Sequence, residues 1–290
     1  MTSRPITRVI AGMNTSDGAG VKLRRTLGQS QLARMDPFLM LDEFSSDNAD
    51  DYIAGFPSHP HRGFETVTYM LDGHMLHEDH MGNRGDLRPG DVQWMTCGRG
   101  IIHSEMPQQK EGRMRGFQLW LNLPAKDKMQ PAAYRDVPAA TMPWHSVDEH
   151  IRIKMIAGNL TINNTSLQGP IQAGGTEPVY ADIEIAANQQ AIIPLPVSHN
   201  AFIYVFEGTL SSAGKAVPQH AAALLGSGDN LQVTTGDEGA RFLLIAGKPL
   251  NEPVVQYGPF VMNSAAEIEQ ALRDYRDGTL TNGGVTALGA

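Results

Sequence analysis

Hydrophobic residues along this chain come in short runs, many of them alternating with polar residues and ending at a turn signal. The run FETVTYML, residues 64–71, is rich in β-branched and aromatic side chains and stops at Asp72-Gly73, a pair typical of hairpin turns. The run GFQLWLNL follows at residues 116–123. The pattern predicts a mostly β protein, with further strands at residues 151–157, 179–185, 201–206 and 241–246.

One late segment has helical spacing instead. The sequence AAEIEQALRDYRD, residues 265–277, follows Ser264, a good helix N-cap, and precedes Gly278, a good helix stop. The residues expected to pack inward, at spacings of i, i+4 and i+7, are Ile268, Leu272 and Tyr275. A second, short helix is predicted near residues 29–35.

The two halves of the chain resemble each other. TYMLDG at residues 68–73 is similar to IYVFEG at residues 203–208, and LRPGDVQWMT at residues 87–96 is similar to LGSGDNLQVT at residues 225–234. Both matches are displaced by about 135 residues, which predicts two copies of one β-rich unit.

A polar, proline-rich stretch at residues 124–145 is the expected linker between these copies. We therefore expect one domain over residues 1–130 and a second over residues 145–290, the latter carrying the C-terminal helix. A chain of 290 residues is long enough for each half to bury its own core.

Composition excludes several classes of protein. The formal net charge of −8 argues against a surface built to neutralise nucleic-acid phosphates. The single cysteine, Cys97, excludes an intrachain disulfide framework and fits a reducing compartment. No apolar run is long enough to span a bilayer, and the N-terminal residues lack an export signal. We expect a soluble cytoplasmic protein that binds neither membrane nor nucleic acid.

Two short motifs carry candidate chemistry. His59-Pro60-His61 is an H-x-H pair, and His103-Ser104-Glu105 is an H-x-E pair. On a β-strand, residues i and i+2 point to the same face, so each pair can aim two ligand atoms at one point. Three imidazoles and one carboxylate would leave coordination positions open, as in a catalytic metal site. Turn glycines near both pairs would let adjacent strands bring them together.

The segments GFPSHPHRGFETVTYMLDG and GDLRPGDVQWMTCGRGIIHSEMP resemble the cupin ligand motifs in the form that pirins use. The segments LARMDPFLMLDEF, GFQLWLNLP and GPFVMN also look pirin-like, so the resemblance covers nearly the whole chain. It implies an all-β bicupin: two tandem antiparallel β-barrels of the jelly-roll type with a short C-terminal helix. The metal ligands that it implies are His59, His61, His103 and Glu105.

Two features depart from the general cupin pattern. Glu65 occupies the usual cupin carboxylate position, but the pirin form places the ligand at Glu105, so Glu65 is expected to support a ligand or to be structural. In the second repeat, the four positions equivalent to the metal ligands hold residues that are not metal ligands: Pro194, Pro196, Arg241 and Leu243. One metal per chain is therefore expected, in the N-terminal domain.

The resemblance implies quercetin 2,3-dioxygenase activity, in which a flavonol and O2 react and carbon monoxide is released. Iron(II) is the first choice of metal, and Mn, Co, Ni, Cu or Zn also suit such ligands. We expect Glu105 both to bind the metal and to accept the proton of the flavonol 3-hydroxyl group. Candidate walls of an apolar substrate pocket are Phe56, Trp94 and Met95.

Other residues near the motifs have ordinary interpretations. His74, His77 and His80 follow the Asp72-Gly73 turn, and a solvated hairpin is favoured over a second metal site. Cys97 is read as a small packing residue rather than a redox group. Arg99 is as consistent with a surface position as with contact to an anionic substrate.

Alternatives to the enzyme remain open at this point. The chain could be an iron-binding, redox-responsive regulator, or a transcriptional co-regulator, that acts through a protein partner. A different cupin chemistry, such as isomerisation of a small acid or sugar, is less favoured because few cationic residues lie near the motifs. An enzyme needs open coordination positions facing an apolar pocket, whereas a regulator needs a surface that changes with the state of the metal.

Overall fold

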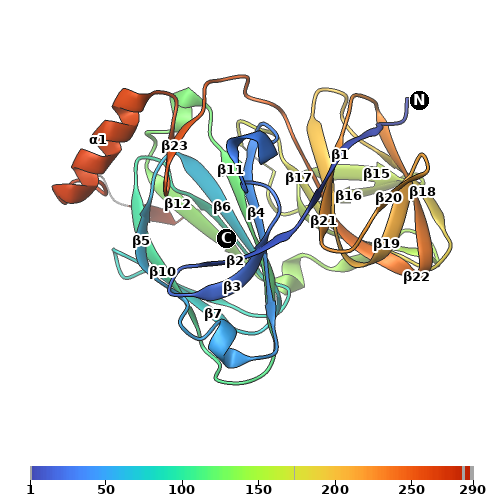
Figure 1. Cartoon of the computed structure of the whole chain (residues 1–290), viewed down its shortest axis with the longest axis horizontal. Coiled ribbons are helices and arrows are strands. Elements are labelled where there is room, and N and C mark those ends of the chain that lie inside the picture. The colour runs from blue at the N-terminus through green and yellow to red at the C-terminus, as the bar shows by residue number, and fades with distance from the viewer. Residues whose placement is uncertain (1, 173, 283–284, 288–290) are drawn as a thin grey trace. The chain divides into compact units, whose positions relative to one another are not determined.

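The computed structural model describes residues 2–172, 174–282 and 285–287. Strands dominate these residues, and one α-helix, α1 (Ala265–Arg276), lies near the C-terminus (Figure 1). The prediction of an all-β fold with a short C-terminal helix is confirmed. The chain divides into two compact units, each made from three separate segments.

The first unit, here called the histidine unit, comprises Asn14–Arg25, Phe38–Ala139 and Leu250–Ala290. An eight-stranded sheet has the order β2 (Met13–Asp17), β3 (Val21–Arg25), β4 (Phe38–Ser46), β11 (Met114–Asn122), β6 (Phe64–Asp72), β9 (Val92–Thr96), β12 (Ala132–Val137) and β25 (Val285–Ala287). A four-stranded sheet has the order β5 (Phe56–His61), β10 (Ile101–Pro107), β7 (Met75–Asp79) and β8 (Arg84–Leu87). A two-stranded ribbon of β23 (Val255–Tyr257) and β24 (Phe260–Met262) precedes α1.

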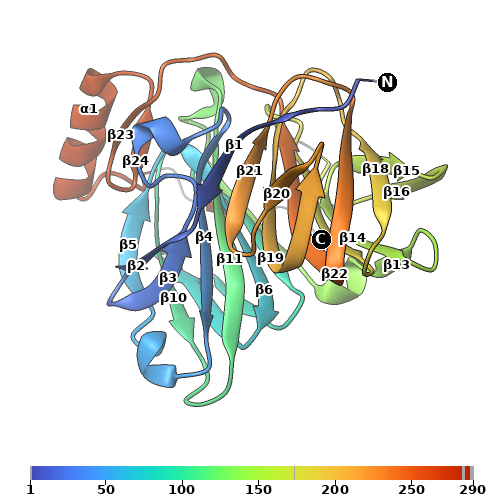
Figure 2. The same ribbon diagram turned by 45° about the vertical axis from the view of Figure 1, so that its right-hand side comes forward.

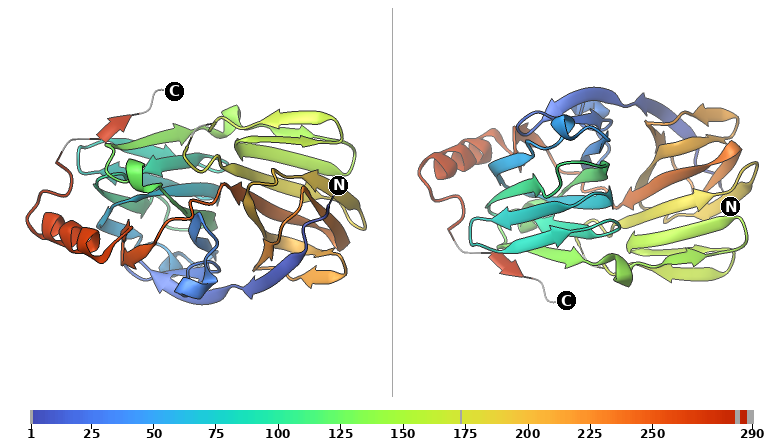
Figure 3. Two further views of the ribbon diagram at one scale, coloured as in Figure 1. Left: turned by 90° about the horizontal axis from the view of Figure 1, so that it is seen from above. Right: turned by 90° about the horizontal axis from the view of Figure 1, so that it is seen from below.

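The two larger sheets of this unit form a sandwich with an open strand order rather than a closed barrel (Figure 3). A hydrogen bond from Thr68 on β6 to Glu105 on β10 joins the sheets across their inner faces. Because side chains alternate along a strand, Thr66 and Thr68 share this inner face, whereas Glu65 and Val67 point the other way.

The second unit, the apolar unit, comprises Met1–Met13, Thr26–Pro37 and Ala140–Pro249. Its main sheet runs in the order β1 (Ile6–Ala11), β21 (Ala221–Leu225), β19 (Asn200–Ser212), β22 (Asn230–Gly247), β17 (Val179–Ile185), β14 (Ile151–Ala157) and β13 (Trp144–Ser146). Two more strands pair with this sheet, β18 (Gln190–Pro194) and β20 (Lys215–Val217), and a separate ribbon holds β15 (Asn159–Ile162) and β16 (Thr165–Gln168). Figure 2 shows β1 alongside β21. One continuous apolar cluster forms the core of this unit.

The compact units do not follow the expected boundaries of 1–130 and 145–290. The first strand, β1, is hydrogen-bonded to β21 and so belongs with the later half of the chain. Helix α1 packs on β23 and β24 and belongs with the histidine unit, not with the later domain as expected. Contacts between segments that are distant in the sequence determine which unit β1 and α1 belong to, and local sequence patterns do not reveal such contacts.

Most predicted strands match observed ones, and β14 and β17 match to the residue. The helix also begins as predicted, with the Ser264 hydroxyl accepting a hydrogen bond from the Glu267 amide. Its inward face was predicted wrongly in part: Ile268 and Ala271 are buried, but Leu272 and Tyr275 are 37% and 44% exposed. The helix predicted near residues 29–35 is one short 3₁₀ turn, Gln31–Ala33.

Among the described residues, no helix combines the length and the apolar character that crossing a membrane requires.

Candidate metal centre

Strands β5 and β10 carry the two histidine motifs and pair side by side in the four-stranded sheet. Their antiparallel register places His59 opposite His103 and His61 opposite Ile101. Along β10 the side chains of Ile101, His103 and Glu105 are buried in alternation, as strand geometry requires. The prediction that adjacent strands bring the motifs together is confirmed for the histidines.

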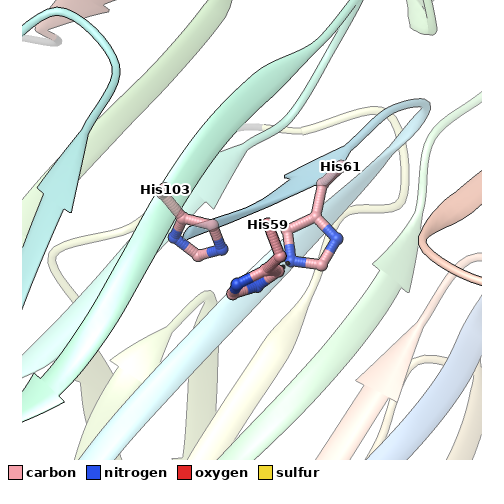
Figure 4. Close-up of side chains that lie close together, drawn as sticks. All are labelled: His59, His61 and His103. Atoms are coloured by element: carbon pink, nitrogen blue, oxygen red, sulfur yellow. Dashed lines mark hydrogen bonds between the residues drawn. The ribbon is translucent and has the colours of Figure 1, made fainter. Parts of the chain in front are cut away.

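The rings of His59, His61 and His103 converge on one point (Figure 4). Their ligand atoms lie within 4.8 Å of one another, and the Nε2 atoms of His59 and His61 are 3.0 Å apart. Within the described part of the chain, these three imidazoles are the single group of three or more His, Cys, Asp or Glu side chains close enough to share a metal ion.

Hydrogen bonds at Nδ1 hold the rings of His59 and His103 so that Nε2 faces the common point. The Nδ1 atom of His59 donates to the carbonyl of Pro57 over 2.8 Å, which leaves Nε2 with a lone pair. The Nδ1 atom of His103 lies 2.8 Å from Nε2 of His77, while Nε2 of His103 is buried without a hydrogen-bond partner. A cation at the common point would satisfy that buried atom, so the triad fits a metal ion.

Burial keeps the imidazoles of His61 and His103 neutral, which is the form that binds a metal. Loss of hydration lowers the pKa of His61 and of His103 well below the usual value, and the neighbouring histidines lower both further. Protons therefore compete with a metal for these two rings only in acid. The triad is consistent with one divalent metal, whose identity the geometry leaves open.

The carboxylate of Glu105 is buried on the same strand but lies outside the triad. Its Oε1 atom is 3.2 Å from the hydroxyl of Thr68, which also lies 2.6 Å from Oε1 of Gln118. Burial raises the pKa of Glu105, while His59 and the Thr68 hydrogen bond act in the opposite direction. Glu105 as a metal ligand stays a prediction.

His77 is the residue that sequence reasoning placed wrongly. It was expected on a solvated hairpin, yet its side chain is 1% exposed and contacts His103 directly. Met75, His77 and Asp79 are buried in alternation along β7, which pairs with β10. The sequence of residues 75–79, MLHED, does not itself alternate between apolar and polar residues, so no local pattern marked His77 as buried. Burial lowers the pKa of His77 to about 4, so it is a neutral partner that orients the ring of His103.

Replacing His77 with alanine is expected to weaken metal binding about 10- to 100-fold, because the ring of His103 loses the contact that fixes it. His77→Gln, whose amide can still reach Nδ1, should recover part of the loss. Competition with a chelator measures the dissociation constant, and His80→Ala on the same hairpin is the control. Equal affinity in His77→Ala and the wild type would show that His77 does not position His103.

Aromatic rings flank the triad on the side of the eight-stranded sheet. Trp120 lies 5.3 Å from the ring of His61, and Phe64 lies 5.1 Å from it. Neither was among the predicted wall residues. Of the three that were, Met95 packs in the same buried cluster as Phe64, whereas Phe56 packs in a different cluster.

Trp94 was also expected in the wall, but it points away from the triad because it neighbours the inward-facing Met95 on β9. Glu65 likewise lies on the outer face of its sheet. Its Oε1 atom accepts a hydrogen bond of 2.7 Å from Thr96 on the neighbouring strand, which agrees with a structural role. Burial raises the pKa of Glu65 to about 7.

The variant Glu65→Gln is expected to stabilise the protein at neutral pH. Since the carboxyl pKa is 4.5 when unfolded and about 7 when folded, the folded wild type holds the extra proton between these values and loses stability as pH rises through them. The gain in unfolding free energy from the substitution should be near zero at pH 4 and about 3 kcal/mol at pH 8. Denaturant unfolding across this range checks it, and a gain that is independent of pH would contradict it.

The other residues near the motifs behave as ordinary structural groups. Cys97 is fully buried, and burial raises the pKa of its thiol well above the usual value, which agrees with a packing role. His74 pairs with Asp86 at the surface, and His80 is exposed. Arg99 donates to the carbonyl of Asn282 over 3.2 Å.

The equivalent positions of the second repeat hold no ligand set in the structure. Arg241 forms a two-point ion pair with Asp182, at 3.0 and 2.7 Å, and Leu243 is buried in the sheet. Pro194 ends β18, and Pro196 lies just beyond it. These positions agree with the expectation that the cation site belongs to the first repeat.

Comparison with known proteins identifies the family of this chain. Residues 20–121 match the family model described as Pirin, and residues 180–281 match the one described as Pirin C-terminal cupin domain. A Pseudomonas aeruginosa protein with the provisional name quercetin 2,3-dioxygenase is 52% identical over 280 residues, 96% of this chain and 98% of its own. Human pirin is 39% identical over 282 residues, 95% and 93% of the two chains.

A crystal structure of quercetin 2,3-dioxygenase from Acinetobacter baumannii superposes with a TM-score of 0.87 at 30% identity, covering 98% of this chain and 100% of that one. The family models and the full-length relatives agree with the two repeats and with the sandwich fold. This chain therefore belongs to the pirin family and is a bicupin.

Proposed function

We propose that this chain is a metal-dependent dioxygenase that cleaves flavonols such as quercetin with O2. The observation that carries the proposal is the triad of converging imidazoles in a chain that is similar, over nearly its whole length, to proteins named quercetin 2,3-dioxygenase. Nitrogen and oxygen ligands with open positions suit oxygen chemistry.

The residues that would hold the metal are His59, His61 and His103 through Nε2, with Glu105 as the fourth ligand. Iron(II) is the proposed metal, and Mn, Co, Ni, Cu or Zn match the same donors. When bound, the metal supplies positive charge that stabilises the deprotonated 3-hydroxyl oxygen of the flavonol.

The side chains of the protein supply the remaining parts of the reaction. A carboxylate oxygen of Glu105 accepts the proton of the 3-hydroxyl group. The hydroxyl of Thr68 fixes the orientation of that carboxylate. Trp120, which is partly exposed beside His61 and packs on the buried ring of Phe64, offers an apolar surface on which an aromatic substrate can pack.

Aerobic incubation with quercetin tests this function. Protein loaded with Fe(II), and separately with each of the other metals, should consume the flavonol, as followed by its absorbance, and release carbon monoxide. His59→Ala should abolish both signals. No consumption with any metal would overturn the dioxygenase and favour the alternative, a metal-responsive regulator that acts through a protein partner.

A further inference from the structure

The residue directly after His61 is an arginine that is 3% exposed, and its side chain reaches the C-terminal segment. Nη1 of Arg62 donates to Oδ2 of Asp274 on helix α1 over 2.7 Å. Nη2 donates to the carbonyl of Leu280 over 3.4 Å, and Nε donates to the carbonyl of Arg99. One guanidinium thus joins the turn after β5, the turn before β10 and helix α1.

The backbone of Arg62 is attached to the same segment. Its amide donates to the carbonyl of Pro259 over 3.2 Å, and its carbonyl accepts from the amide of Val261 over 3.0 Å. The next residue, Gly63, has φ of +90°, and a Cβ there would lie 2.0 Å from the carbonyl oxygen of Val261. The ligand strand therefore ends in close contact with β24, at a position that accepts only glycine.

A buried lysine stabilises the contact between Gly63 and β24. Nζ of Lys128 donates to the carbonyls of Gly63 and Val261, over 2.6 and 3.1 Å, and to Oδ1 of Asn122 over 2.6 Å. All three protons of the ammonium group are used, and its side chain is 1% exposed. Burial lowers the pKa of Lys128 to about 8.

The second ligand strand touches the same segment. Ile102, the residue before His103, packs against a buried cluster made from β24, α1 and the turn after it: Phe260, Met262, Ile268, Ala271 and Leu280. Figures 1 and 2 both show α1 beside β23 at the end of the unit that carries β5. Residues 259–282, here called the C-terminal clamp, thus hold the residue next to His61 and the residue next to His103.

We propose that Arg62 is a positioning residue that couples metal binding at the histidine triad to docking of the C-terminal clamp. The inference rests on the proposed metal site. The docked clamp fixes the orientation of the His61 ring, so a metal binds more tightly to protein in which the clamp is docked. By thermodynamic linkage, the bound metal must stabilise docking of the clamp by the same factor.

Hydrogen exchange and metal affinity test this coupling together, with Ni(II) as the probe because it is stable in air and imidazole binds it well. In the wild-type protein, Ni(II) should slow amide exchange in α1. Arg62→Gln should weaken Ni(II) binding about tenfold or more and should abolish the metal-dependent protection of the helix. Asp274→Asn should act in the same direction, and the asparagine keeps an oxygen that can accept the hydrogen bond of the buried arginine; the melting temperature of each metal-free variant is recorded beside that of the wild type.

The controls separate positioning from general stability. Arg273→Gln changes a neighbouring, 48% exposed arginine that pairs with Glu269 on the same helix, and should leave both readouts unchanged. The double variant Arg62→Gln/Asp274→Asn should bind Ni(II) about as weakly as Arg62→Gln alone, because the second change removes a bond that is already lost. Arg62→Lys should restore only part of the affinity, since a single ammonium group cannot reproduce the fork of three bonds.

The outcomes that would overturn the proposal are distinct from those that would overturn the metal site. If the wild type binds Ni(II) and the Arg62 and Asp274 variants bind it equally well, Arg62 does not position the triad. If the variants lower the melting temperature of the metal-free and metal-loaded protein by the same amount, Arg62 is structural only. Failure of the wild type to bind Ni(II), Fe(II) or Mn(II) would instead remove the metal site on which the coupling rests.

Discussion

His103→Ala should lose metal binding and, with it, flavonol cleavage. His103 is the member of the triad whose Nε2 atom is buried without a hydrogen-bond partner. A cation can therefore bind to this atom without breaking a hydrogen bond within the protein. Changes to residues that merely support a ligand cost about 10- to 100-fold in affinity, and removing the ligand itself is expected to cost more than about 100-fold. Metal content after dialysis and a chelator competition measure the loss.

The matched control for His103→Ala is His145→Ala, which removes an exposed imidazole from the apolar unit and should retain the metal. The alanine also leaves a cavity, so the melting temperature of the metal-free variant must be recorded beside that of the metal-free wild type. A variant that folds, binds Fe(II) with wild-type affinity and cleaves quercetin would remove His103 from the site.

Glu105→Gln should separate metal binding from turnover. The amide keeps the shape of the side chain and can still contact Thr68, but it cannot accept a proton at neutral pH. We expect metal binding to weaken while kcat falls about 10²- to 10⁴-fold, the usual contribution of a positioned general base. Steady-state cleavage of quercetin by metal-saturated enzyme measures the effect.

Glu111→Gln, an exposed carboxylate in the loop after the same strand, is the control for Glu105→Gln and should behave as the wild type. Turnover that survives in Glu105→Gln at full metal occupancy would show that another group takes the proton. Loss of the metal alone, with normal turnover per bound ion, would leave Glu105 as a ligand and not a base.

The parts of the fold that follow from local pattern were predictable. Strands such as β14 and β17 show alternation that needs no knowledge of their neighbours, and the histidine pairs follow from the same period of two. The face of α1 was less predictable, because Ala271 rather than Leu272 lies against the buried cluster of β24. A small side chain there lets the helix approach closely, and a hydrophobicity pattern ranks leucine above alanine.

The parts that depend on distant pairing were not predictable from one sequence. His77 is buried because β7 pairs with β10, so that a histidine after a hairpin turn becomes a neighbour of His103. Arg62 reads as a surface residue until its partner Asp274 is placed beside it. The C-terminal segment likewise belongs to the histidine unit because of contacts with residues far away in the sequence.

That assignment has a consequence for how the protein is made. The ribosome releases residues 38–139, which bear all three histidines, well before it produces residues 250–290, and the whole of residues 140–249 lies between. Chains emerge and fold from the N-terminal side, so the strands bearing the histidines must wait for their last partner. The strands that carry the histidines therefore lack the packing of residues 250–290 until that segment has been made.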